Sequence, residues 1–242
     1  MTMTTRIEVR GDRARPRVTL RGGLLVPRRL PGAEGTVRVA LVASTALLLA
    51  GDRVCVDVVV DAGLALDVVE TAGTVAYAMR GGSARWDVTA EVGRDATLIW
   101  SALPFVVADG ARVSRSAEVD LADGAAAVLR ESLVLGRTGQ AGGCLDARTR
   151  VRVEGRPVLV ESLRLDPAAR RDPAVLAGAR CLDTVTVLGS RLPDDVDVLQ
   201  LDGNGSVARH LVDQLHQSPL DATFRAAAER AVRRPAPYDP SR

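Results

Sequence analysis

The stretch VSRSAEVDLADGAAAVLRESLVLG, residues 113–136, predicts the fold. Its first nine residues alternate between apolar side chains for a core and polar side chains for solvent. The apolar set is Val113, Ala117, Val119 and Leu121, and the polar set is Ser114, Ser116, Glu118 and Asp120. An Ala122-Asp123-Gly124 turn follows, and a second apolar run ends at Gly136. The stretch is therefore typical of a strand–turn–strand unit.

The same unit recurs toward the N-terminus. Residues 53–60, 64–69 and 86–92 also alternate with period two, and similar turns at 61–63 and 93–95 precede new strands. Turns about thirty residues apart predict a layered stack of short strands, a β-helix-like body. A plain β-sandwich would give similar alternation and remains the alternative.

Two further segments complete the β-strand prediction. Residues 149–165 predict a hairpin that turns at 154–157. The most apolar run, VALVASTALLLAG at 39–51, is too short to span a bilayer, so we interpret it as a buried strand pair. Between residues 5 and 200 the chain therefore predicts a mainly β body.

The period changes near residue 205. Val207, Leu211 and Leu215 are four residues apart, which favours a helix. A second helix is predicted from Ser218 as N-cap and Pro219 as first helical residue. Its expected apolar face is Leu220, Phe224, Ala227, Ala228 and Ala231. We therefore predict one domain over 1–242, with a β body at 5–200, a helical pair at 205–233 and a frayed tail at 234–242.

Composition excludes several functions. A net charge of +2 gives no reason to expect nucleic acid or a membrane as a partner. All 32 basic residues are arginine, which excludes chemistry that needs a lysine amine. None of the three cysteines lies in a C-x-x-C motif, which favours a reducing, cytoplasmic location.

Catalytic signatures are also absent from the sequence. It contains no G-x-S-x-G, H-E-x-x-H, G-x-x-x-x-G-K-[ST] or G-x-G-x-x-G motif. His210 and His216 are six residues apart, so on a helix they would point in different directions. A small hydrolase, or a binding module on a β scaffold, remains the alternative function. The hydrolase would need one of these histidines to reach a serine on the β body.

Four carboxylates adjoin apolar strand runs: Asp52, Glu70, Glu131 and Glu161. One interpretation places each in solvent or beside an arginine, because buried unpaired carboxylates are rare. The other places several of them along an interior polar passage. Carboxylate oxygens are hard ligands that can pass on a divalent cation without trapping it.

Five ordered segments carry a resemblance to a known family: LLAGDRVCVDVVVDAG, ETAGTVAYAM, ATLIWSALPFVVADGARVSRS, LRESLVLGRTGQAGG and VRVEGRPVLVESLRLD. Over about residues 37–190 the chain resembles the UreD (UreH) family of urease accessory proteins. It departs from the family pattern before Asp52, where residues 44–50 replace a His-Pro-Pro-Gly-Gly approach, and in its short C-terminal region.

The resemblance implies a β-helix-like body with two helices, no enzymatic activity and no tightly bound cofactor. It implies binding to the urease apoprotein and to UreF, which recruits the GTPase UreG. It also implies delivery of a transient nickel ion through an internal passage. The family's polar passage positions correspond here to Asp52, Thr74, Glu131 and Glu161.

Overall fold

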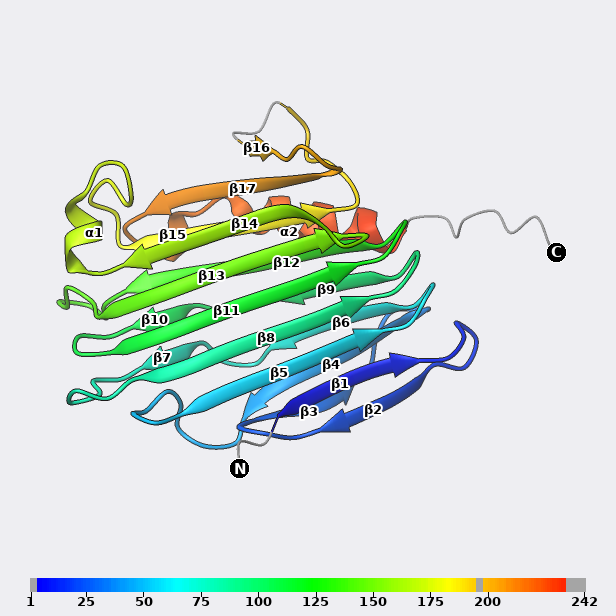
Figure 1. Ribbon diagram of the computed structural model, residues 1–242, viewed down its shortest axis with the longest axis horizontal. Helices are drawn as coiled ribbons and strands as arrows, with labels where there is room; N and C mark the ends of the chain where they lie inside the picture. The colour runs from blue at the N-terminus through cyan, green and yellow to red at the C-terminus, as the bar shows by residue number, and fades with distance from the viewer. Residues whose placement is uncertain (1–3, 195–197, 234–242) are drawn as a thin grey trace.

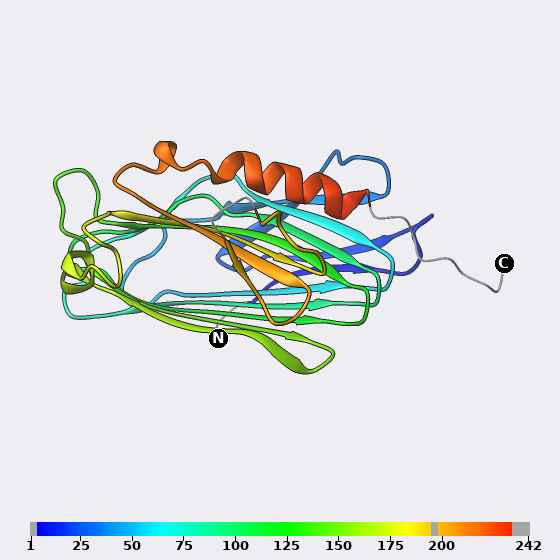
Figure 2. The ribbon, with the colours of Figure 1, turned by 90° about the horizontal axis from the view of Figure 1, so that it is seen from above.

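Two β-sheets lie face to face in the computed structural model, which describes residues 4–194 and 198–233 (Figure 2). Sheet A contains β14 (Arg156–Leu165), β13 (Cys144–Val153), β11 (Arg112–Leu121), β8 (Ala84–Val92), β5 (Arg53–Val60), β1 (Thr5–Arg10) and β2 (Arg17–Arg21), in that order. Sheet B contains β16 (Val198–Gln200), β17 (Gly205–Val212), β15 (Cys181–Leu188), β12 (Ala126–Leu135), β9 (Thr97–Ser101), β6 (Ala65–Glu70), β4 (Thr36–Ala43) and β3 (Leu25–Leu30). Two short strands, β7 (Thr74–Ala76) and β10 (Phe105–Val107), pair with each other, and β10 also pairs with β12.

The central chain winds between the sheets like a coil (Figure 1). It passes from β5 to β6, from β8 to β9 and from β11 to β12, each time from sheet A to sheet B, and successive coils pair in parallel. The predicted repeat is confirmed, because its turns stack. The Gly63 N–H donates to the Arg94 carbonyl at 2.8 Å, and the Asp95 N–H donates to the Asp123 carbonyl at 3.1 Å.

The main core fills the space between the sheets. Alternation along the strands correctly predicted residues of this core: Val54, Val56, Val58 and Val60 are all buried on the inner face of β5. The predicted hairpin is confirmed as β13 and β14, which are joined by Glu154 and Gly155, both with positive φ. The two sheets thus bury one apolar face each, as a half-buried alternating strand requires.

A second apolar layer lies on the outer face of sheet B. Helix α2 (Leu220–Val232) packs there through Leu220, Phe224, Ala227 and Ala231, against residues that include Val185 and Ala208. All eight residues of β15 are consequently buried, because both of its faces are covered. The apolar face predicted for this helix is confirmed, although Ala228 is only half-buried and the cap residue is Pro219.

Two predicted elements are wrong. Residues 205–217 form strand β17 and a short 3₁₀ helix, Leu215–Gln217, instead of the first helix of a C-terminal pair. A spacing of four keeps side chains on one face of a strand as well as of a helix, so it could not decide between them. Residues 39–51 give one strand, β4, and an irregular loop, where a strand pair was expected.

The remaining helix, α1 (Pro167–Arg171), is one short turn after β14, and the Asp166 carboxylate accepts hydrogen bonds from the Ala168 and Ala169 N–H groups there. The predicted frayed tail, 234–242, lies outside the described residues. Among the residues that are described, no helix has the length and apolar character needed to cross a membrane.

Candidate functional site

A cavity of about 100 Å³ lies between the two sheets, and acidic side chains from both sheets line it. Glu70 comes from β6, Glu131 from β12 and Glu161 from β14. Apolar side chains such as Leu98, Val119 and Leu129 form most of the remaining wall. Such a space has room for several water molecules. The fold therefore brings together two of the predicted passage residues, Glu131 and Glu161, with the further carboxylate Glu70.

Arg115 reaches Glu131 from the opposite sheet. Its Nη1 lies 2.8 Å from Glu131 Oε1, and the side chains are 15% and 38% exposed. The contact is an ion pair without the alignment of a hydrogen bond, because the buried Nη1 has no aligned acceptor. The guanidinium also lies 4.5 Å from the ring centroid of Phe105, a cation–π distance. Arg115 is therefore held inside the core by a carboxylate and an aromatic ring.

A second arginine bridges the sheets at Glu161. Arg209 on β17 contacts Glu161 on β14 through Nη1–Oε1 at 2.8 Å and Nη2–Oε2 at 3.0 Å. Two parallel contacts of this kind fix both side chains. The Arg209 Nε also donates to Thr184 Oγ1, at 3.3 Å. Each predicted passage acid in this cavity is thus neutralised by an arginine from the facing sheet.

Glu70 differs from the other two acids, since no ion pair involving it occurs within residues 4–194 and 198–233. Its Oε2 accepts the Leu103 N–H at 3.0 Å, and its Oε1 accepts Trp100 Nε1–H at 3.4 Å. Burial raises the pKa of the Glu70 carboxyl above its usual value. The residue is half-buried, and it lines the cavity.

Glu70 and Trp86 also line a neighbouring cavity of about 190 Å³. Thr74 lies in this second cavity, together with Leu47 and Tyr77. Glu70 therefore lines both cavities, whereas Thr74 lines the second and Glu131 the first. Three of the four predicted passage residues line one or other of these adjoining spaces.

Asp52, the fourth predicted residue, lines neither cavity. Its Oδ2 accepts the Leu49 N–H at 2.7 Å in the turn before β5. No ion pair joins Asp52 to Arg53 in the described part of the chain. Asp52 stabilises a turn in this structure, and its place in a passage stays a prediction.

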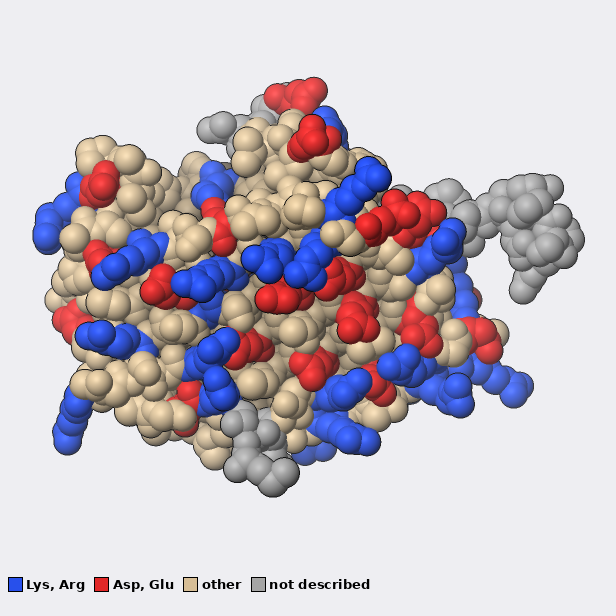
Figure 3. All heavy atoms as spheres, viewed as in Figure 1, with Lys and Arg blue, Asp and Glu red and all other residues tan. Residues whose placement is uncertain are grey.

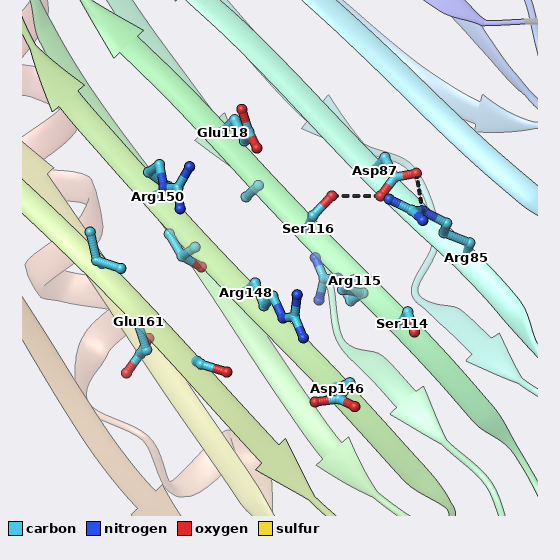
Figure 4. Close-up of a pocket in the computed structure, with 14 residues that line it drawn as sticks. Arg85, Asp87, Ser114, Arg115, Ser116, Glu118, Asp146, Arg148, Arg150 and Glu161 are labelled. Carbon is cyan, nitrogen blue, oxygen red and sulfur yellow. Dashed lines mark hydrogen bonds and ion pairs between the residues drawn. The ribbon is translucent and has the colours of Figure 1, made fainter. Parts of the chain in front are cut away.

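A wider groove of about 590 Å³ crosses the outer face of sheet A (Figure 4). Figure 4 shows Ser116 of β11 donating to Asp87 of the neighbouring strand β8, and Asp87 pairing with Arg85 of its own strand. Both Asp87 contacts measure 2.5 Å. Polar groups of β8 and β11 here satisfy one another.

The histidines lie apart from these spaces. His210 on β17 and His216 in the 3₁₀ helix are both exposed, and neither lines the outer groove or the two cavities. Across the described ranges, no three His, Cys, Asp or Glu side chains gather in a way that could hold a metal ion. Cys55, Cys144 and Cys181 are all free thiols.

Sequence reasoning missed the two bridging arginines for different reasons. Arg115 has the same parity as Val113 and Ala117, so strict alternation already pointed it inward. Arg209 was missed because its segment was predicted as a helix, which hides the inward parity that it shares with Val207. Glu70 was noticed as a carboxylate beside an apolar run, but no sequence signal placed it between two cavities.

Comparisons with known proteins agree on one family. The family profile described as "UreD urease accessory protein" matches residues 4–232. The "Urease accessory protein UreD 1" of Streptomyces griseus is 41% identical over 209 residues, which cover 86% of this chain and 82% of the relative. The "Urease accessory protein UreD" of Parafrankia sp. is 35% identical, covering 78% of this chain and 74% of the relative. That of Streptomyces avermitilis is also 35% identical, covering 76% of each chain.

Proposed function

The chain belongs to the UreD family of urease accessory proteins, and from this premise we propose that it is a scaffold for nickel delivery to urease. In this proposal it binds UreF, and through UreF the GTPase UreG, on the urease apoprotein. It acts in the cytoplasm, without enzymatic activity of its own. The nickel ion is cargo that passes through the protein.

The observation that carries the proposal is the pair of adjoining cavities between the sheets. Their linings include Thr74, Glu70, Glu131 and Glu161, so each cavity offers side-chain oxygen atoms that could contact a cation. Oxygen ligands suit a divalent cation that must be released again, whereas thiolates would hold it tightly. The passage would run from the Thr74 cavity past Glu70 to Glu131 and Glu161.

The bridging arginines would keep the binding of a metal ion in this passage weak. Glu131 and Glu161 are each paired with a guanidinium at 2.8 Å. A cation that approaches either carboxylate must displace or share that arginine, so its hold on the site is weakened by like-charge repulsion. Glu70 has no such competitor among the described residues, but burial raises its pKa, so its proton competes with the metal.

The test is reconstitution in cells that express the urease subunits, UreF and UreG. With this chain present, we expect co-purification of UreF and full nickel content in urease by metal analysis. Without it, urease should contain little nickel. A chain that fails to co-purify with UreF, or urease that is fully loaded in its absence, would contradict the proposal.

The hydrolase alternative makes a different prediction. Both histidines are exposed and outside the cavities, so replacing them removes no part of the proposed passage. We expect the double variant His210→Ala/His216→Ala to support nickel loading of urease at the wild-type level. Loss of a measurable hydrolytic activity in that variant would favour the enzyme instead.

A further inference from the structure

An uneven distribution of charge marks the N-terminal part of the fold. Residues 4–38 contain nine arginines and three acidic residues, so this segment carries a net charge of +6 although the whole chain carries only +2. The segment forms β1, β2, β3 and the start of β4, where the edges of the two sheets meet. Figure 3 shows arginines gathered over this region, at the lower right. Positive charge is thus concentrated at one corner of the molecule.

Six of these arginines define what we call the basic corner: Arg13, Arg15, Arg17, Arg21, Arg28 and Arg29. All six are exposed. The other three arginines of the segment, Arg6, Arg10 and Arg38, pair with Glu8, Asp61 or Asp67. Within the described ranges none of the six has an ion-pair partner. Their mutual repulsion favours the binding of counterions or of an acidic partner.

The basic corner is also hollowed. A groove of about 780 Å³ runs between the loop at 11–16 and the loop at 31–35, with Arg13, Arg29 and Arg38 in its wall. Apolar groups such as Pro16, Leu30 and Val37 line much of the rest, and Glu34 is the one acidic side chain among the described residues of its lining. A groove with guanidinium groups along its wall and apolar groups between them matches an extended segment with acidic and apolar side chains.

The groove is organised before any partner arrives. Asp12 Oδ1 accepts the N–H groups of Ala14 and Arg15, both at 2.9 Å, which fixes the first loop. Asp61 holds the start of the same loop, because its Oδ2 accepts the Gly11 N–H at 3.1 Å. A loop that is already ordered loses little conformational entropy on binding.

We infer that the basic corner is a docking site for an acidic segment of a partner protein. Nucleic acid fits less well, because residues 4–38 contain no aromatic side chain on which a base could stack. The inference does not depend on the cavities between the sheets, which lie elsewhere in the fold and share no residue with this groove. The docking inference can therefore be wrong while the proposed metal passage is right, and the passage can be wrong while the docking inference is right.

The experiment measures binding of the full chain to a fluorescent deca-glutamate peptide by anisotropy, at low and at high salt. We expect the wild type to bind, with an affinity that falls as salt rises. The charge reversal Arg13→Glu/Arg29→Glu should weaken binding by about tenfold or more. The matched control Arg150→Glu/Arg156→Glu makes the same charge change at exposed arginines on β13 and on the edge strand β14, at the other end of sheet A, and should weaken it by less than about threefold.

The inference is overturned if the wild type does not bind the peptide, or if the control variant loses as much affinity as the charge reversal. It is also overturned if a duplex DNA of equal charge binds about tenfold more tightly than the peptide, which would indicate a nucleic-acid site. Thermal melting of each variant checks that the fold is kept. The neutral variant Arg13→Gln/Arg29→Gln replaces the charge reversal if that variant does not fold, and should show the same direction of change.

Discussion

Two substitutions that break the same ion pair should have different effects on nickel transfer. Glu131→Gln removes a carboxylate from the cavity and leaves Arg115 as an uncompensated positive charge. Arg115→Gln removes the positive charge and leaves Glu131 free to hold a cation. The first makes the cavity wall more positive and the second makes it more negative. If the cavity carries nickel, the first substitution should hinder the ion and the second should not.

For stability the two variants should rank the other way, with Arg115→Gln the more damaging substitution. Removing one partner of a fully buried pair costs about 3–5 kcal/mol, and an exposed pair contributes about 0–1 kcal/mol. Glu131 is 38% exposed and Arg115 keeps its contact with Phe105, so we expect Glu131→Gln to cost about 1–2 kcal/mol. Arg115→Gln also loses the cation–π contact, which is worth about 0.5–2 kcal/mol more. At about 2–4 °C per kcal/mol, Arg115→Gln should have the lower Tm.

The assay compares three quantities for the wild type and both variants: Tm by circular dichroism, recovery of the complex with UreF, and nickel per urease active site by metal analysis. We expect both variants to form the complex. Nickel loading should fall in Glu131→Gln and stay closer to the wild type in Arg115→Gln. The reasoning is refuted if nickel loading follows Tm, with Arg115→Gln the poorer variant, because the pair would then be a structural contact only.

Three further predictions concern stability. Asp183 is fully buried beside Arg130, Ser132 and Ser218, so Asp183→Asn should lower the free energy of unfolding by about 3 kcal/mol in chemical denaturation. The control Asp123→Asn removes a charge from an exposed pair with Arg94 and should lower it by less than about 1 kcal/mol. Because burial raises the pKa of Glu70, its folded form binds the proton more tightly than its unfolded form, and its contribution to stability is lost as pH rises above about 4.3. Glu70→Gln should therefore gain stability relative to the wild type from pH 4 upward, and a difference in Tm that stays constant with pH would contradict this. Gly143→Ala would place a Cβ against the Ala111 carbonyl oxygen, closer than van der Waals contact allows, so it should lower the free energy of unfolding by about 1–3 kcal/mol. The control Gly22→Ala adds a Cβ that makes ordinary contacts and should change stability by less than about 0.5 kcal/mol. Equal losses in the two variants would refute the packing argument.

Much of the β body follows from alternation, because an extended chain sends side chains to opposite faces with a period of exactly two residues. Residues 53–60 form β5 with the predicted face inward, and the turns at 61–63, 93–95 and 122–124 mark successive coils. The same rule, applied without exception, would have placed Arg115 in the core. It failed at 205–212 because Val207 and Leu211 share a face in either a helix or a strand, and the partners β15 and β16 decide between them.

The site was less accessible to sequence reasoning, because its residues meet only through pairing between distant strands. Glu161 and Arg209 are 48 positions apart, and they face each other because β14 ends sheet A where β17 nears the end of sheet B. Glu131 and Glu161 were chosen because they follow apolar runs, which places an acid on a strand but does not show what opposes it. Of the two interpretations of these carboxylates, pairing with arginine is confirmed for Glu131 and Glu161, which also line a cavity, and lining a passage stays a prediction.

A carboxylate that lines the cavity and is also paired with an arginine suggests how an apolar core could contain a route for a cation. An unpaired carboxylate inside the core would be costly, and its pKa would rise until it became neutral, as the direction of the Glu70 shift illustrates. An arginine from the facing sheet keeps Glu131 and Glu161 in place at a lower cost, while the pair stays partly exposed to the cavity. In the proposed passage a divalent cation would then exchange places with a guanidinium, so that no bare carboxylate has to exist before the metal arrives. On this view the bridging arginines stand in for the cargo: Arg115 and Arg209 make the acids tolerable in the core, and the acids alone would be needed to pass the ion.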